Sequence, residues 1–347
     1  MTRIYLDHAA TTPLRAEARE AMVAAMEVAG NPSSVHAEGR AAKRLIETAR
    51  QTIAEAVGAV GADVVFTSGA TEAAALALAG RRLSGSAIEH DAVWSWVADE
   101  VPVDADGLVQ VVDPARTTLQ LANSESGIVQ DLPQGIAVSD ITQGFGKVPF
   151  AFNWSGAGMV FLSAHKIGGP KGIGALIFPQ GTDIKAQILG GGQEMGRRSG
   201  TENVIGIAGF AAATAAAQAD LADGRWNAIA ENRNILEQAI EAAAPETIFV
   251  GKGARRLPGT SYFVTQGWKG ETQVMAMDLA GFAVSAGSAC SSGKVKSSRV
   301  LRAMGFSEAD AACGLRVSLG VETTEAEVLQ FAEAWADRHK KWRARAA

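Results

Sequence analysis

The chain has 347 residues, of which 47% are hydrophobic and 20% charged, so it is long enough for two domains and can bury a substantial core. Its formal net charge of -5, without a long basic stretch, argues against a nucleic-acid-binding protein. It has no apolar run long enough to cross a bilayer and no basic start followed by an apolar segment, so we expect a cytoplasmic protein without membrane contact.

The N-terminal two thirds alternates between short apolar runs and helical patterns. We expect a first strand from Ile4, helices over 17–28 and 41–57, and short strands over 64–67, 119–122, 136–138, 158–162 and 175–178. This alternation is typical of an α/β domain with a mainly parallel sheet. Polar segments follow several of these strands, and ligands of such sheets bind beyond the carboxyl ends of the strands.

Lys166 lies at the end of one such strand, in the segment FLSAHKIGGPKGIGALIF (161–178). The glycines after it let the backbone approach a ligand closely, and Ser163 and His165 add a hydroxyl and an imidazole. Lys166 could therefore be a counter-charge for a phosphate or an amine that forms a Schiff base with a carbonyl cofactor. A surface lysine in a turn is the alternative from this segment alone.

Three further segments have the residue types of a phosphate-bearing cofactor site. Ser68–Glu72 joins a strand to a helix, as in anion sites at helix N-termini, although a simple helix cap has the same pattern. Asp140 ends a strand and could pair with a protonated ring nitrogen. His90 follows a short apolar piece, and a lone histidine is more often structural than catalytic.

The C-terminal third has a different pattern. A long helical stretch runs to about Ala244, and 260–264, 270–279 and 282–284 are predicted as strand, helix and strand. A strand over 315–319 and a helix over 325–341 complete a smaller α+β domain. We predict a large domain over 14–250 and a small domain formed by 1–13 and 251–347.

Cys290 and Cys313 are the only cysteines, so neither a disulfide framework nor a cysteine-based zinc site is expected, and we predict no metal site. Cys290 lies among small residues in SAGSACSSG (285–293), unlike a buried structural cysteine. It is placed to be reached by a reactant. Cys313 precedes a strand, and we interpret it as structural.

Nine segments in a fixed order resemble the cysteine desulfurases of the NifS/IscS type, within the class V aminotransferase group of fold-type I pyridoxal phosphate (PLP) enzymes. They are YLDHAATTP, GNPSSVHAEGR, VFTSGATE, Glu89-His90, SDITQ, SAHKIGGPKGIGAL, GGGQEMGRRSGTEN, SAGSACSSG and LRVSLG. The similarity extends from Tyr5 to about Gly320. It implies a large domain with a mainly parallel sheet of the seven-stranded type and a smaller C-terminal domain that carries the cysteine segment.

The resemblance also implies the cofactor contacts. Lys166 would bind PLP and then act as the base toward the substrate, Asp140 would keep the ring nitrogen protonated, and Gln143 would bind the ring hydroxyl. His90 would stack on the ring and serve in proton transfers. The phosphate would be held by Ala70, Thr71, Ser163 and His165, together with Thr201 from the other subunit of a homodimer.

Substrate handling follows from the same resemblance. Arg316 would bind the carboxylate of L-cysteine, and the Cys290 thiolate would take the sulfur as a persulfide and release alanine. The sulfur would then pass to an acceptor protein, for example in iron–sulfur cluster biogenesis.

Three departures from the family pattern stand out. Ser124 occupies the place of an asparagine that normally contacts cofactor and substrate, and Asn123 is the neighbour that could take over this substrate-binding role. The chain is short before His90, before Leu119 and near Ile136. The lead-in Ser86–His90 is reduced. A selenocysteine lyase or another PLP β-eliminating enzyme, and a PLP-fold scaffold without strong catalysis, are therefore the alternative functions.

Overall fold

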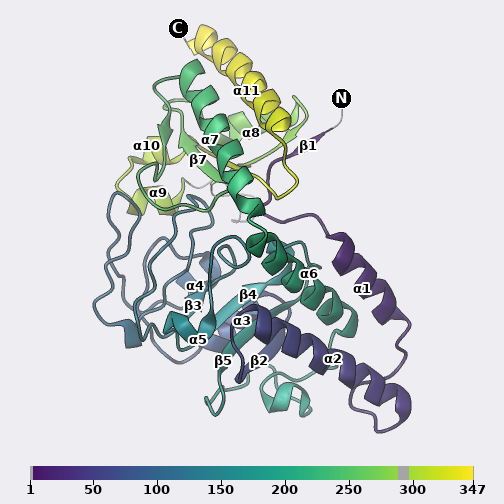
Figure 1. Ribbon diagram of the computed structural model, residues 1–347. Coiled ribbons are helices and arrows are strands. Elements are labelled where there is room, and N and C mark those ends of the chain that lie inside the picture. Colours follow the sequence, from purple (N-terminus) through teal and green to yellow (C-terminus); the bar gives the residue numbers. More distant parts are fainter. Residues whose placement is uncertain (1–2, 288–296, 347) are drawn as a thin grey trace.

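The computed structural model describes residues 3–287 and 297–346, which form two α/β units, one below the other in Figure 1. The larger unit carries the helices α1 (Ala16–Met26), α2 (Ala37–Ala56), α3 (Ala70–Leu78), α4 (Asp91–Trp94), α5 (Phe152–Ser155) and α6 (Val204–Ala222). It also carries the 3-10 turns η1 (Pro114–Arg116), η2 (Ala164–Lys166) and η3 (Gln193–Gly196).

The sheet of the larger unit has the strand order β2 (Ala62–Thr67), β5 (Gly174–Pro179), β4 (Val160–Ser163), β3 (Ser139–Asp140). β5 is antiparallel to both of its neighbours, and β3 is parallel to β4. Isolated parallel bridges continue the order beyond β3, joining Thr118 to Val138, Ser84 to Thr117 and Gly85 to Glu100. Among the described residues the sheet thus contains seven segments, of which only β5 runs against the others, and the expectation of a mainly parallel sheet is confirmed.

Helix α6 is the centre of the helical layer, and α1 and α2 pack against it (Figure 1). Its small residues permit this close contact: a Cβ atom on Gly209 would lie 2.6 Å from Cγ of Met22 in α1. Of the described helices, α6 alone is long and apolar enough to cross a membrane, and 56% of that stretch is buried inside the protein. Its apolar character therefore serves the core.

The smaller unit has an antiparallel sheet in the order β6 (Ile248–Phe249), β7 (Thr260–Val264), β10 (Gly314–Ser318), β9 (Ser285–Ala286). The N-terminal strand β1 (Ile4–Tyr5) pairs in parallel with β8 (Phe282–Ala283). The helices of this unit are α7 (Arg225–Ala243), α8 (Gly270–Asp278), α9 (Arg299–Ala303), α10 (Glu308–Ala311) and α11 (Glu325–Ala346).

Two sequence-based expectations need correction. The long helix predicted to end near Ala244 is two helices, because Gly224 between α6 and α7 adopts a left-handed φ of 70°. The strands expected over 119–122 and 136–138 are reduced to short pairings, such as the bond from the Leu119 N–H to the Val138 carbonyl.

Helix α7 packs on α11 and β6 pairs with β7, so we propose that the smaller unit begins near Gly224 rather than after residue 250.

Candidate active site

A cavity of about 500 Å³ lies beyond the ends of β2, β3 and β4. It brings together most of the residues predicted from the sequence, namely Ala70, Thr71, His90, Ser124, Asp140, Gln143, Ser163, His165, Lys166 and Arg316. Asn123 and Thr201 do not line it, and Cys290 lies outside the described residues. The polar strand ends thus converge on one cavity, as the α/β topology requires.

Lys166 lies on the wall of the cavity at the end of η2, directly after β4. Its Nζ donates hydrogen bonds to the carbonyl oxygens of Ala9 and Ala10, at 2.7 and 2.8 Å. The main chain of Lys166 is tied to the same N-terminal segment, because Thr12 Oγ1 donates to its carbonyl at 3.0 Å. The amine is therefore held between the strand end and the segment that follows β1.

Asp140 lines the cavity, and the buried Glu89 is near enough for the charge of Asp140 to act on it. Burial raises the pKa of Asp140, although the Thr142 N–H donates to its Oδ1 at 2.8 Å. Burial and the charge of Asp140 raise the pKa of Glu89 to about 8. The raised pKa of Glu89 favours its protonated form and so limits the negative charge beside Asp140.

The Gln143 side chain has its orientation fixed by two neighbours. Its Nε2 donates to the Ala9 carbonyl at 2.8 Å, and its Oε1 accepts from Lys147 Nζ at 3.2 Å. A carbonyl oxygen only accepts, so the Gln143 amide nitrogen must face Ala9 and the amide has one possible direction. Burial, followed by the charges of Lys166 and Arg316, lowers the pKa of Lys147 to about 7.

The N-terminus of α3 also lines the cavity, through Gly69, Ala70 and Thr71. Gly69 is the residue before the helix, with φ 154°, and no side chain caps the first turn. Gly174 in β5 passes so close that a Cβ atom there would lie 2.8 Å from the Gly69 backbone. Unsatisfied N–H groups at a helix N-terminus bind anions, and Ser163 adds a hydroxyl beside them.

His165 also lines the cavity, and its Nδ1 lies 3.2 Å from Thr11 Oγ1. Burial and the nearby Lys166 lower its pKa to about 4, so the ring is neutral at neutral pH. The cavity lining thus includes a carboxyl group for the ring nitrogen of PLP, helix N–H groups for its phosphate and an amine for its aldehyde. The residues fit this cofactor.

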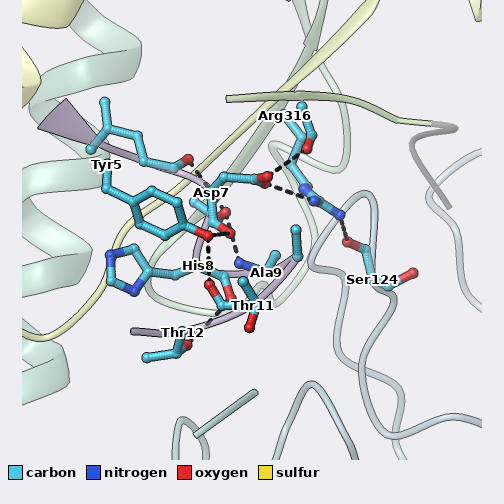
Figure 2. A network of polar contacts seen from close by, with 12 residues as sticks. Tyr5, Asp7, His8, Ala9, Thr11, Thr12, Ser124 and Arg316 are labelled. Atoms are coloured by element: carbon cyan, nitrogen blue, oxygen red, sulfur yellow. Dashed lines mark hydrogen bonds and ion pairs between the residues drawn. The ribbon is translucent and has the colours of Figure 1, made fainter. Parts of the chain in front are cut away.

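Arg316 in β10 enters the cavity from the smaller unit (Figure 2). Its Nη1 donates to the Ser124 carbonyl at 2.7 Å, and its Nη2 pairs with Asp7 Oδ1 at 3.0 Å. Its Nε is buried and has no hydrogen-bond partner among residues 3–287 and 297–346. The guanidinium is thus oriented by two contacts and keeps one buried donor for an anion.

Asn123 has a role that the sequence did not reveal. Its Oδ1 accepts hydrogen bonds from the Glu125 and Ser126 N–H groups at 2.9 and 2.8 Å, and its Nδ2 donates to the Ile88 carbonyl at 2.8 Å. The side chain is 1% exposed and fully engaged in its own turn. The residue on the cavity wall is Ser124, and its observed contact with Arg316 is made by the main chain.

Thr201 is exposed on this chain and lies outside the cavity. Cys313 is buried, and its Sγ donates to the Ala309 carbonyl at 3.2 Å.

No role was predicted from the sequence for Asp7, Lys147 or Arg299. Asp7 lies within a family segment, which was the one available signal, whereas the contacts of Lys147 and Arg299 arise only in the folded chain.

Comparisons with known proteins give a consistent result. The model of the aminotransferase class-V family matches residues 4–96 and 104–331. A cysteine desulfurase of Cereibacter sphaeroides is 37% identical over 96% of this chain and 95% of its own length. An IscS-like cysteine desulfurase of Mycobacterium tuberculosis is 35% identical over 93% of each chain.

The comparison with solved structures agrees with this family assignment. The NifS-like protein from Rickettsia africae has a TM-score of 0.88 and 31% identity, covering 97% of this chain and 99% of its own. The structure described as SspA in complex with cysteine has a TM-score of 0.75 and 28% identity, covering 93% and 100%. The alignment with the Cereibacter protein spans 372 positions, more than the 347 residues of this chain, so that relative has segments that this chain lacks.

Proposed function

The chain belongs to the aminotransferase class-V family and functions as a cysteine desulfurase, and we propose that it binds PLP at Lys166 and transfers the sulfur of L-cysteine to Cys290. The observation that carries this proposal is that Lys166, Asp140 and the start of α3 line one cavity. The selection of L-cysteine is supported by the relatives and by the cysteine complex of SspA.

When bound, PLP would supply a ring that stabilises negative charge developing on the substrate Cα. Asp140 would hold the proton on the ring nitrogen, and the raised pKa of Glu89 favours the uncharged form of the neighbouring carboxyl group. Gln143 offers its second N–H to the ring hydroxyl while Lys147 and Ala9 keep its amide in place. The N–H groups of Ala70 and Thr71, with Ser163 and neutral His165, hold the phosphate.

The chain's own groups then handle substrate and protons. Arg316 binds the carboxylate of L-cysteine with the donors that face the cavity, and Lys166 moves the proton from the substrate Cα. His90 lies on the same cavity wall, where it can cover the ring and exchange protons with the substrate. The Cys290 thiolate would attack the substrate sulfur, so that an S–S bond forms as the substrate C–S bond breaks. The electron pair of the C–S bond stays with the substrate, which takes up a proton at Cβ and leaves as alanine.

The test is an absorbance spectrum of the purified protein with PLP, followed by addition of L-cysteine and assay of alanine and sulfide. We expect a yellow protein that forms alanine. Lys166→Ala should lose the yellow band and the activity, whereas Lys185→Ala, an exposed lysine outside the cavity, should keep both. A protein that cannot be loaded with PLP would contradict the proposal.

The sulfur-transfer step can be tested with a matched pair of variants, because the chain contains two cysteines. Cys290→Ala should still bind PLP but form no persulfide and little alanine. Cys313→Ala changes a buried cysteine that does not line the cavity and should retain the persulfide. Alanine formation at the wild-type rate by Cys290→Ala would remove this residue from the mechanism.

We also propose a cytoplasmic homodimer in which the exposed Thr201 of one chain contributes to the phosphate site of the other. The sulfur would pass to the thiol of an acceptor protein, such as an iron–sulfur scaffold. Mixing Lys166→Ala with Thr201→Ala chains tests the shared site: a mixed dimer should regain activity in the one site that has both residues intact.

A further inference from the structure

The segment that leads to His90 is buried but has little sheet pairing of its own. Parallel bridges end at Ser84 and Gly85, and Ala87, Ile88 and Glu89 are 8%, 2% and 1% exposed. Buried carbonyl groups require hydrogen-bond partners, and a longer strand would have found them in the sheet. In this chain, whose lead-in to the histidine is short, side chains supply them instead.

Arg299 provides two of these bonds from the first position of α9. Its Nη1 donates to the Ala87 carbonyl, and its Nη2 donates to the Glu89 carbonyl at 3.0 Å. The same Nη2 lies 2.5 Å from Asp91 Oδ1. One guanidinium group thus contacts the residues immediately before and immediately after His90.

Two further contacts show that this is a close-fitting site. The Arg299 guanidinium carbon lies 5.0 Å from the ring centre of Trp94, the last residue of α4. The Ile88 carbonyl, between the two that Arg299 binds, accepts from Gln120 Nε2 and Asn123 Nδ2 at 2.9 and 2.8 Å. The rigid planar fork of arginine can span two carbonyls and a carboxylate, which a lysine ammonium cannot do as well.

His90 is the residue directly before α4, and its Nδ1 accepts a hydrogen bond from the Ala92 N–H at 3.1 Å. Its place on the cavity wall is therefore set by the backbone on either side of it. We propose that Arg299 is a positioning residue that fixes His90 against the bound cofactor, a role that rests on the proposed function. The contact also links α9 of the smaller unit to the cofactor side of the larger unit.

The key variant is Arg299→Met, which keeps the length of the side chain and removes all of its donors. The matched control is Arg302→Met on the same helix, since within residues 3–287 and 297–346 the one ion pair of Arg302 is with the exposed Glu308, at 3.3 Å. Arg299→Lys keeps the charge and should restore part of the function. Cofactor orientation is read from the visible circular dichroism of the PLP-loaded protein, without turnover.

We expect Arg299→Met to weaken the visible dichroism band and to lower kcat by about 10- to 100-fold, because small displacements of a group at the reacting centre have effects of this size. Arg302→Met should match the wild type in both readouts. In a His90→Ala background, Arg299→Met should cause little further loss, since residues that act through one another are not additive.

The inference is overturned if Arg299→Met lowers only the melting temperature, or if it causes the same loss with and without His90. If Arg299→Met folds poorly, the loss with and without His90 is compared for Arg299→Lys instead. A wild-type protein that does not bind PLP would instead contradict the proposed function. The two failures are therefore distinguishable.

Discussion

Asp7 and Arg316 lie 309 positions apart in the sequence, yet their side chains form an ion pair of 3.0 Å (Figure 2). The Arg316 side chain is 3% exposed, and the second Asp7 oxygen accepts from Ser285 Oγ at 2.8 Å. Asp7 follows β1 and leads into Ala9 and Ala10, which hold the Lys166 amine. The pair therefore joins the predicted substrate-binding arginine to the segment that positions the predicted catalytic lysine.

Asp7→Ala should destabilise the protein strongly, because it leaves the buried guanidinium of Arg316 without its counter-charge. Loss of one partner from a buried pair costs about 3 kcal/mol or more in the free energy of unfolding. The control is Asp278→Ala, which breaks the exposed pair with Arg3 and should cost less than about 1 kcal/mol. Urea unfolding measures both, and equal losses would contradict the structural role of Asp7.

Glu89 should make the stability depend on pH. Its pKa rises from 4.5 to about 8 on folding, so the folded protein holds a proton that the unfolded chain releases between these values. The free energy of unfolding should fall as pH rises through this window, by about 1 kcal/mol per pH unit from this group. Glu89→Gln should flatten the fall. Glu38→Gln, at an exposed position, should leave it as in the wild type.

Gly174→Ala should weaken PLP binding. The new Cβ would lie 2.7 Å from the Leu162 carbonyl and 2.8 Å from the backbone of Gly69, which precedes α3. Overpacking of this kind costs about 1 to 3 kcal/mol, and a loss of 1.4 kcal/mol in binding raises Kd about tenfold. Gly253→Ala has nothing within 4 Å of the new Cβ and should bind PLP normally in a fluorescence titration.

Asn123→Ala and Ser124→Ala should affect different properties. Asn123→Ala removes the acceptor of two buried N–H groups, and we expect the free energy of unfolding to fall by about 2 kcal/mol. Ser124→Ala keeps the main-chain bond to Arg316, so stability should change by less than about 0.5 kcal/mol and KM for L-cysteine should stay near the wild-type value. A large KM change in Ser124→Ala would instead assign a substrate contact to its hydroxyl.

The sequence alone determined the parts of this protein that depend on local pattern. Apolar runs and helical periodicity predicted β2, β5, β7, α2 and α8 because each element is specified by its own residues. The segments around Ala70, Asp140 and Lys166 predicted one cofactor site, since strand ends of a parallel sheet must converge. The family followed from these segments and their order.

Only the tertiary structure decided how residues far apart in the sequence are joined. It separated Asn123, which closes its own turn, from Ser124, which lies on the cavity wall, although the two are neighbours. It also brought Arg299 to the backbone on both sides of His90 and Asp7 to Arg316. The Arg299 contacts depend on the packing of the smaller unit against the larger one, and the Asp7–Arg316 pair depends on the pairing of distant segments within the smaller unit. A directional hydrogen bond between distant residues leaves no periodic trace in the sequence.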